Sequence, residues 1–226
     1  MNKLAIKTAV FVMIPVIAMA DQSVYIDQTG ETFDFTITQS GDGNAIGDAM
    51  NALPYFVFDG DSQVIDITQT GDYNTITGNM QGDNIIFNLV TTGDTNTFDI
   101  TSTMMDYSTL TYNIAGIGNA LIFSLGQSVS AQYTTLTYDI MGNDNSGTWT
   151  IDADGVTQDV DITGNDNVLI YTATGYGTSV DGHTLTADVL GSNNAITILQ
   201  ETTIAASNIN ITTDGSDQIL SITQSD

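Results

Sequence analysis

Basic residues are almost absent from this sequence of 226 residues. Lys and Arg together number only two, Lys3 and Lys7, whereas Asp and Glu together number 27. A chain with this balance cannot neutralise phosphates, so ordinary nucleic-acid binding is excluded. Anionic membrane surfaces would repel it as well. The same charge is compatible with solubility in salty water and with the binding of cations.

Cysteine is absent and histidine occurs once, as His183. The chain can therefore form no disulfide and no thiolate metal site. Without Cys or cationic side chains there is no credible triad, Schiff base or phosphate clamp, and no pair of carboxylates stands out as a glycosidase dyad. We expect no enzymatic activity. His183 is expected to be exposed in a loop, and Trp149 to face the core.

The first twenty residues have the pattern of an export signal. Lys3 and Lys7 precede an apolar stretch, which ends in Ala18-Met19-Ala20, a small-x-small cleavage pattern. The apolar run is too short for a stable membrane span. We expect residues 1–20 to be a signal peptide cut before Asp21, and residues 21–226 to form one secreted domain.

A repeat built on glycine and asparagine runs through that domain. The anchor glycines are spaced by 22 to 30 residues, and Asn follows three residues after seven of the eight, with Gln in the last. Such a period indicates a stacked repeat architecture of about eight units. The pairs are Gly41 and Asn44, Gly71 and Asn74, Gly93 and Asn96, Gly116 and Asn119, Gly142 and Asn145, Gly164 and Asn167, Gly191 and Asn194, and Gly215 and Gln218.

On both sides of each anchor, apolar residues alternate with Thr, Asp, Asn and Ser. A period of two predicts strands with one buried face. A two-stranded unit cannot bury that face alone, but stacked units can. The fold class we predict is all-β: a β-solenoid of stacked strand–arch–strand repeats. We attribute the arch to positive φ, which Gly reaches freely and Asn tolerates.

The connection at the other end of each repeat is expected to be variable in length. One such loop, 47–62, contains Phe56 and Phe58. Packing of these rings in the core is the favoured interpretation, and an exposed contact patch is the alternative.

Residues 37–46, ITQSGDGNAI, and residues 67–76, ITQTGDYNTI, resemble curlin repeats, the units of curli amyloid fibres on bacterial cells. The matching residues are Gln39, Gly41 and Asn44 in the first segment and Gln69, Gly71 and Asn74 in the second. From Gly93 onward the Gln position holds Thr, Ile or Val, and the Gly-rich export segment of such subunits is missing.

The resemblance implies a secreted, self-associating subunit of an extracellular fibre at the bacterial surface, serving biofilm matrix or adhesion. It implies a nucleator subunit and a secretion machinery as further partners. The physical argument agrees, because the end rungs of a solenoid are open strand edges that can template another chain. Head-to-tail stacking would extend both sheets, and the Asn residues would form an amide ladder. Turn geometry alone is the other explanation of the Asn residues.

Two acidic columns are candidates for weak cation binding. Asp139, Asp161 and Asp188 precede their anchor glycines by three residues and are expected to stack on one outer face. Asp42, Asp72 and Asp94 directly follow theirs. Each neighbouring pair, about 4.8 Å apart, would cost on the order of 1 kcal/mol in water, so salt or Ca²⁺ should stabilise the chain. A solvated acidic surface is the alternative, and no calcium-loop signature is present.

Two further functional classes remain open. One is a monomeric secreted solenoid that binds a cation, a glycan or ice, although the outer faces mix Thr with Asp and Asn rather than presenting a regular Thr array. The other is a surface filament or adhesin that assembles differently.

Overall fold

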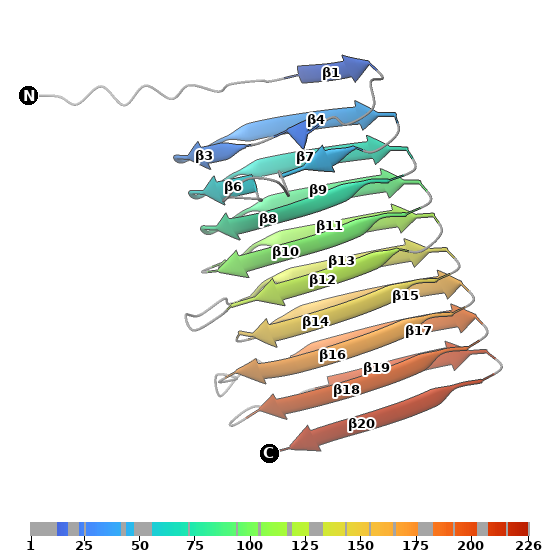
Figure 1. Cartoon of the computed structure of the whole chain (residues 1–226). Helices are drawn as coiled ribbons and strands as arrows, with labels where there is room; N and C mark the ends of the chain where they lie inside the picture. The colour runs from blue at the N-terminus through green and yellow to red at the C-terminus, as the bar shows by residue number, and fades with distance from the viewer. Residues whose placement is uncertain are drawn as a thin grey trace, which may run out of the picture.

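The computed structural model describes residues 13–17, 23–24, 26–41, 44–47, 56–71, 73–93, 95–103, 105–116, 119–126, 133–142, 144–153, 155–164, 166–175, 183–191, 193–202, 208–215 and 217–225. Within these residues every regular element is a β-strand, and the strands stack as rungs from the N-terminal end to the C-terminal end (Figure 1). The chain is an all-β solenoid of two parallel sheets, so the predicted fold class is confirmed.

The strands alternate between the two sheets along the chain. Among the described residues, sheet A has nine strands: β1 (Met13–Ile17), β4 (Asp34–Ser40), β7 (Val64–Thr70), β9 (Ile86–Thr92), β11 (Thr109–Ala115), β13 (Thr135–Met141), β15 (Thr157–Gly164), β17 (Thr184–Gly191) and β19 (Asn208–Asp214). In the same described part of the chain, sheet B has eleven strands: β2 (Ser23–Val24), β3 (Asp27–Thr29), β5 (Ala45–Ile46), β6 (Phe56–Asp59), β8 (Thr75–Gln81), β10 (Thr97–Thr103), β12 (Ala120–Leu125), β14 (Ser146–Asp152), β16 (Val168–Gly175), β18 (Ala195–Thr202) and β20 (Ile219–Ser225).

The short strands of sheet B are pieces of two rungs. β2 pairs with β5, β3 pairs with β6, and both β5 and β6 pair with β8. Sheet B therefore has nine levels, the first formed by β2 with β3 and the second by β5 with β6. All neighbouring strands are parallel and in register, as in Ile37 beside Ile67 and Tyr112 beside Tyr138.

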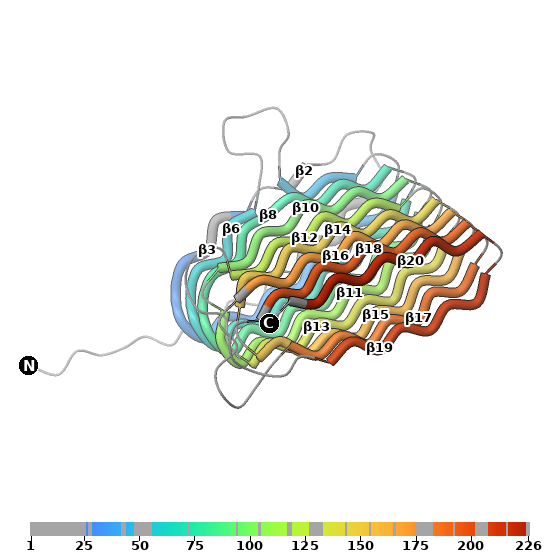
Figure 2. Tube along the Cα trace, turned by 90° about the horizontal axis from the view of Figure 1, so that it is seen from below, coloured from blue at the N-terminus to red at the C-terminus, as the bar shows by residue number. Residues whose placement is uncertain are grey.

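The two sheets pack face to face, as the view along the stack shows (Figure 2). Alternate residues of the strands from β4 to β18 are buried, which is the period of two in the sequence expressed as one core face. Leu110, Tyr112 and Ile114 of β11 are all fully buried or nearly so, and Trp149 is fully buried as expected.

Glycines make room for the largest rings of this core. Phe56 and Phe58 are fully buried, so their rings pack in the core as favoured, but they belong to strand β6 and not to a loop as expected. A Cβ on Gly78, the residue of β8 that pairs with Phe56, would lie 2.1 Å from its ring. Gly147 accommodates Trp149 in the same way, at 2.6 Å.

Candidate functional site: the arch columns and the ends of the solenoid

Each rung crosses from sheet A to sheet B through what we call the first arch, the four residues from an anchor glycine to its Asn. Consecutive anchor glycines lie directly on one another. A Cβ on Gly93 would lie 1.6 Å from the carbonyl oxygen of Gly71, and one on Gly116 would lie 1.4 Å from that of Gly93. No side chain fits at this distance, so the repeat of glycine is required by the close approach of successive rungs.

The Asn side chains of the first arch form a continuous ladder inside the protein. Nδ2 of each Asn donates to Oδ1 of the next over five consecutive links of 3.0–3.2 Å, through Asn74, Asn96, Asn119, Asn145, Asn167 and Asn194. Each Nδ2 also donates to the carbonyl of its own anchor glycine, as in Asn119 to Gly116 at 3.0 Å. All six side chains are buried. The Asn column therefore forms hydrogen bonds within each first arch and between successive first arches.

The structure corrects our explanation of the arch from backbone conformation. No Asn of the first arch has positive φ among the described residues, and of the anchor glycines only Gly41, Gly71, Gly116 and Gly191 do. Hydrogen bonding, rather than tolerance of positive φ, accounts for the Asn. Close approach accounts for the Gly.

The two ends of the Asn column differ from its middle. Nδ2 of Asn44 donates to the carbonyl of Thr70 at 3.3 Å. Gln218, the last member, is exposed and donates to the carbonyl of Gly215 at 3.0 Å. The glutamines of the curlin-like segments lie in a second buried column, where Nε2 of Gln69 donates to Oε1 of Gln39 at 2.8 Å.

The acidic column predicted on the outer face of sheet A is present. Asp139 pairs with Asp161, and Asp161 with Asp188, on consecutive strands. Partial burial and the nearby carboxylates of Asp159, Asp188 and Asp139 raise the pKa of Asp161 above its ordinary value. No group of three or more His, Asp or Glu in the described part of the chain could hold a metal ion. The other three candidates, Asp42, Asp72 and Asp94, lie outside the described residues.

A second arch joins sheet B to the next strand of sheet A, and its length varies as predicted, from four residues between β3 and β4 to nine between β12 and β13. Gly30 begins this arch in the first rung, and Gly60 and Gly82 occupy its place in the next two. Positive φ recurs at one position of these connections, with values of 54–57° at Thr32, Ser62, Asn84, Tyr107 and Tyr133. The chemistry of that position varies from rung to rung, so no single residue type reveals it in the sequence.

His183 was expected to be an exposed loop residue, and this expectation is wrong. The side chain is fully buried, and neither ring nitrogen has a hydrogen-bond partner among the described residues. It occupies the position that Val156 holds one rung earlier, since the following residues, Thr157 and Thr184, are paired. Burial lowers the pKa of the His183 imidazole, because the charged form loses its hydration.

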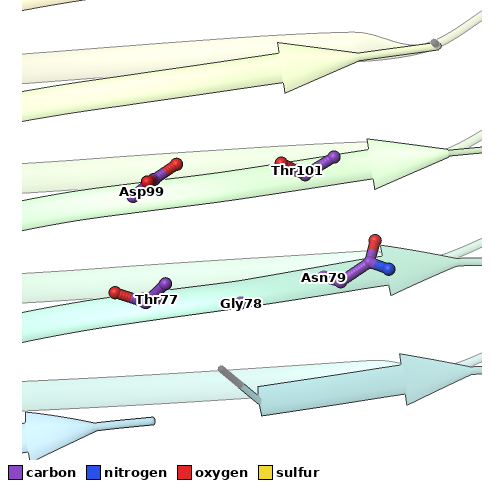
Figure 3. Close-up of a pocket in the computed structure, with 5 residues that line it drawn as sticks. All are labelled: Thr77, Gly78, Asn79, Asp99 and Thr101. Carbon is purple, nitrogen blue, oxygen red and sulfur yellow. The ribbon is translucent and has the colours of Figure 1, made fainter. Parts of the chain in front are cut away.

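The outer face of sheet B has a hollow lined by Thr77, Gly78 and Asn79 of β8 and by Asp99 and Thr101 of β10 (Figure 3). These are ordinary positions of two paired strands, in which Asp99 lies beside Thr77 and Thr101 beside Asn79. The hollow offers one carboxylate and three uncharged polar side chains.

The C-terminal end of the solenoid exposes residues that the preceding rungs bury. Leu220 is 51% exposed and Ile222 is 47% exposed, whereas Ile196 and Ile198, their partners in β18, are 2% and 1% exposed. β19 and β20 are the last strands of their sheets, so each has a neighbour on one side only among the described strands.

Comparison with models of protein families, with curated proteins and with solved structures gave no match. Among the described residues, no helix is long and apolar enough to cross a membrane.

Proposed function

We propose that this chain is a secreted structural subunit, not an enzyme, that assembles head to tail into an extracellular cross-β fibre of the curli type. The observation that supports this most strongly is the open C-terminal rung, in which the core-facing Leu220 and Ile222 are half exposed. Burying such side chains against another copy is favourable, at about 25 cal/mol for each Å² of apolar surface.

The backbone at this end supports the same proposal. An edge strand presents unpaired N–H and C=O groups, which a parallel strand of another molecule can satisfy. β20 ends in Ser221-Ile222-Thr223-Gln224-Ser225, a polar sequence without charge or proline to discourage pairing. Addition of rungs by a second chain continues both sheets, as in cross-β assemblies.

The acidic surface is consistent with this role. Asp139, Asp161 and Asp188 face outward along the stack, so their charge repels the flanks of neighbouring fibres without affecting the ends. Growth along the axis is thereby favoured over lateral clumping. We further propose that the first twenty residues are removed during export, and that a nucleator subunit and a secretion machinery act with the chain at the cell surface.

A single pair of variants tests the proposal. Ile222→Asp places a charge at the core-facing position of β20, whereas Ser221→Asp adds the same charge to its outward face. Because both positions are exposed in the monomer, both variants should fold, which circular dichroism can verify.

Sedimentation and electron microscopy of the exported protein would follow assembly over days in buffer with high salt. The wild type and Ser221→Asp should form unbranched fibres, and Ile222→Asp should remain in the supernatant. If Ile222→Asp assembles as the wild type does, the C-terminal rung is not the growing surface, and the proposal is wrong.

A further inference from the structure

Without β1, which lies in the predicted signal peptide, the two sheets contain unequal numbers of rungs. Sheet A then begins at β4 and has eight strands, while sheet B has nine levels, from β2 with β3 to β20. The described strands after β1 thus begin and end in sheet B. If copies stacked by simple translation, sheet A would lack one strand at every junction, between β19 of one copy and β4 of the next.

A half turn of the second copy about the solenoid axis removes this gap. Strands of sheet A run toward the first arch and strands of sheet B run away from it, so the half turn exchanges the two sheets and preserves parallel pairing. β20 would then meet β4 of the next copy, and β19 would meet residues 23–29. Every level of both sheets is filled in this arrangement.

The sequences of the two end rungs match this arrangement residue by residue. Residues 208–225 align with residues 23–40 without a gap. Each segment spans one level of one sheet, a four-residue arch that begins with glycine, and the next strand of the other sheet. In 23–40 these are β2 with β3, then β4, and in 208–225 they are β19, then β20. Gly215 lies opposite Gly30, and Ile222 to Ser225 lie opposite the identical residues Ile37 to Ser40.

The alignment also pairs core positions with core positions. Leu220, Ile222 and Gln224 of β20 fall opposite the buried Phe35, Ile37 and Gln39 of β4. The buried pair of Gln69 and Gln39 would thereby continue into Gln224 of the preceding copy. Between β19 and the first rung, Ile211 falls opposite Ile26, which packs against the core.

Charge is compatible with this junction. In the alignment, the acidic residues of the described end rungs fall opposite uncharged residues: Asp27 opposite Thr212, Asp34 opposite Ile219, Asp214 opposite Thr29, and Asp217 opposite Thr32. No carboxylate lies opposite another carboxylate, in contrast to the stacked Asp139, Asp161 and Asp188 within the molecule.

The structure also shows that the N-terminal edge of β4, which β20 of another copy would meet, can pair with a parallel strand in this register. β1 lies there, with Met13 to Ile17 opposite Thr36 to Ser40. These are the residues of β4 that Ser221 to Ser225 of another copy would pair with. Since β1 belongs to the predicted signal peptide, its removal would free the edge.

We propose that successive copies in the fibre are related by a half turn about the solenoid axis, with β20 on β4 and β19 on residues 23–29. This inference rests on the proposed head-to-tail assembly and specifies its junction. The Asn column of one copy then meets the second arch of the next, so the Asn ladder does not continue through the junction.

Cysteine pairs can distinguish the two junctions, because the natural chain has no cysteine. Thr38→Cys with Thr223→Cys, and Asp27→Cys with Thr212→Cys, place thiols opposite each other only after a half turn. Asp27→Cys with Thr223→Cys does so only after simple translation. Paired residues of neighbouring strands are about 4.8 Å apart, within the Cα separation that a disulfide spans. The two cysteines of each pair lie at opposite ends of the molecule, so a disulfide between them must join two copies.

Each exported double variant would be assembled under reducing conditions, oxidised with copper phenanthroline in air, dissolved in denaturant and run on a non-reducing gel. The half turn predicts ladders of covalent oligomers from the first two variants, with at least tenfold less from the third and from the single variants. Fibres that cross-link only through the third variant would overturn the half turn while the proposed function stands. Absence of fibres from the wild type would overturn both.

Discussion

Replacing the buried Asn119 by alanine should lower the free energy of unfolding far more than the same replacement at a solvent-exposed asparagine. Asn119 lies in the middle of the Asn ladder and is nearly fully buried. Its Nδ2 donates to Gly116 O at 3.0 Å and to Asn145 Oδ1 at 3.2 Å, and its Oδ1 accepts from Asn96 Nδ2 at 3.0 Å.

The size of the effect follows from the groups that the substitution leaves unpaired. Asn145 Oδ1 and the Gly116 carbonyl would each lose a buried hydrogen bond, and such a loss costs about 1–3 kcal/mol for each group. Asn96 Nδ2 would keep its bond to the Gly93 carbonyl at 3.2 Å. We therefore expect the free energy of unfolding to fall by about 3 kcal/mol.

A matched control is available in Asn193→Ala. Asn193 Nδ2 donates to Asp166 Oδ1 at 2.7 Å, but this pair is exposed, so its loss should cost less than about 1 kcal/mol. Urea unfolding, followed by the fluorescence of the buried Trp149, would measure both variants. Equal losses for Asn119→Ala and Asn193→Ala would refute the argument that burial of the amide ladder stabilises the arches.

Three other predictions concern the remaining columns. Gly116→Ala should lower the free energy of unfolding by more than about 2 kcal/mol, because the new Cβ would lie 1.4 Å from the Gly93 carbonyl; urea unfolding at wild-type stability would contradict this. Asp161→Asn should raise the melting temperature at low salt and reduce its increase with NaCl or Ca²⁺, and an unchanged salt dependence would argue against repulsion in the column. Because the pKa of Asp161 is raised, the stability that its ionised form costs should be recovered as the pH falls through the folded-state pKa. Because the pKa of His183 is lowered, protonation of its imidazole should destabilise the fold as the pH falls below about 6.5. His183→Val, which copies Val156 in the same position, should remove that part of the pH dependence of stability, and identical pH profiles of the two proteins would contradict the burial of a neutral imidazole.

The period of the sequence was sufficient to predict the solenoid, since each buried strand face appears as an alternation of two and each first arch as Gly and Asn at fixed spacing. The chemistry of the arch was harder to predict. The distance between successive glycines depends on how closely the rungs stack, which no single repeat encodes. The recurring positive-φ position of the second arch was not predicted, because it holds Thr, Ser, Asn, Tyr or Gly in different rungs.

His183 was misplaced for a related reason. Its segment, GYGTSVDGH, has the composition of a loop, and the residue is buried only because the following strand, β17, brings it into the column that Val156 occupies in the rung before. Register between rungs, rather than local sequence, decides which side of the chain faces the core at such a position.

The most direct test of fibre formation is fibre diffraction with electron microscopy on the exported protein after days in buffer with high salt and Ca²⁺. We expect unbranched fibres with a meridional reflection at about 4.8 Å, the spacing of neighbouring strands along the solenoid axis. A protein that stays monomeric and rich in β-structure throughout would contradict it and would direct attention to ligands of the isolated solenoid.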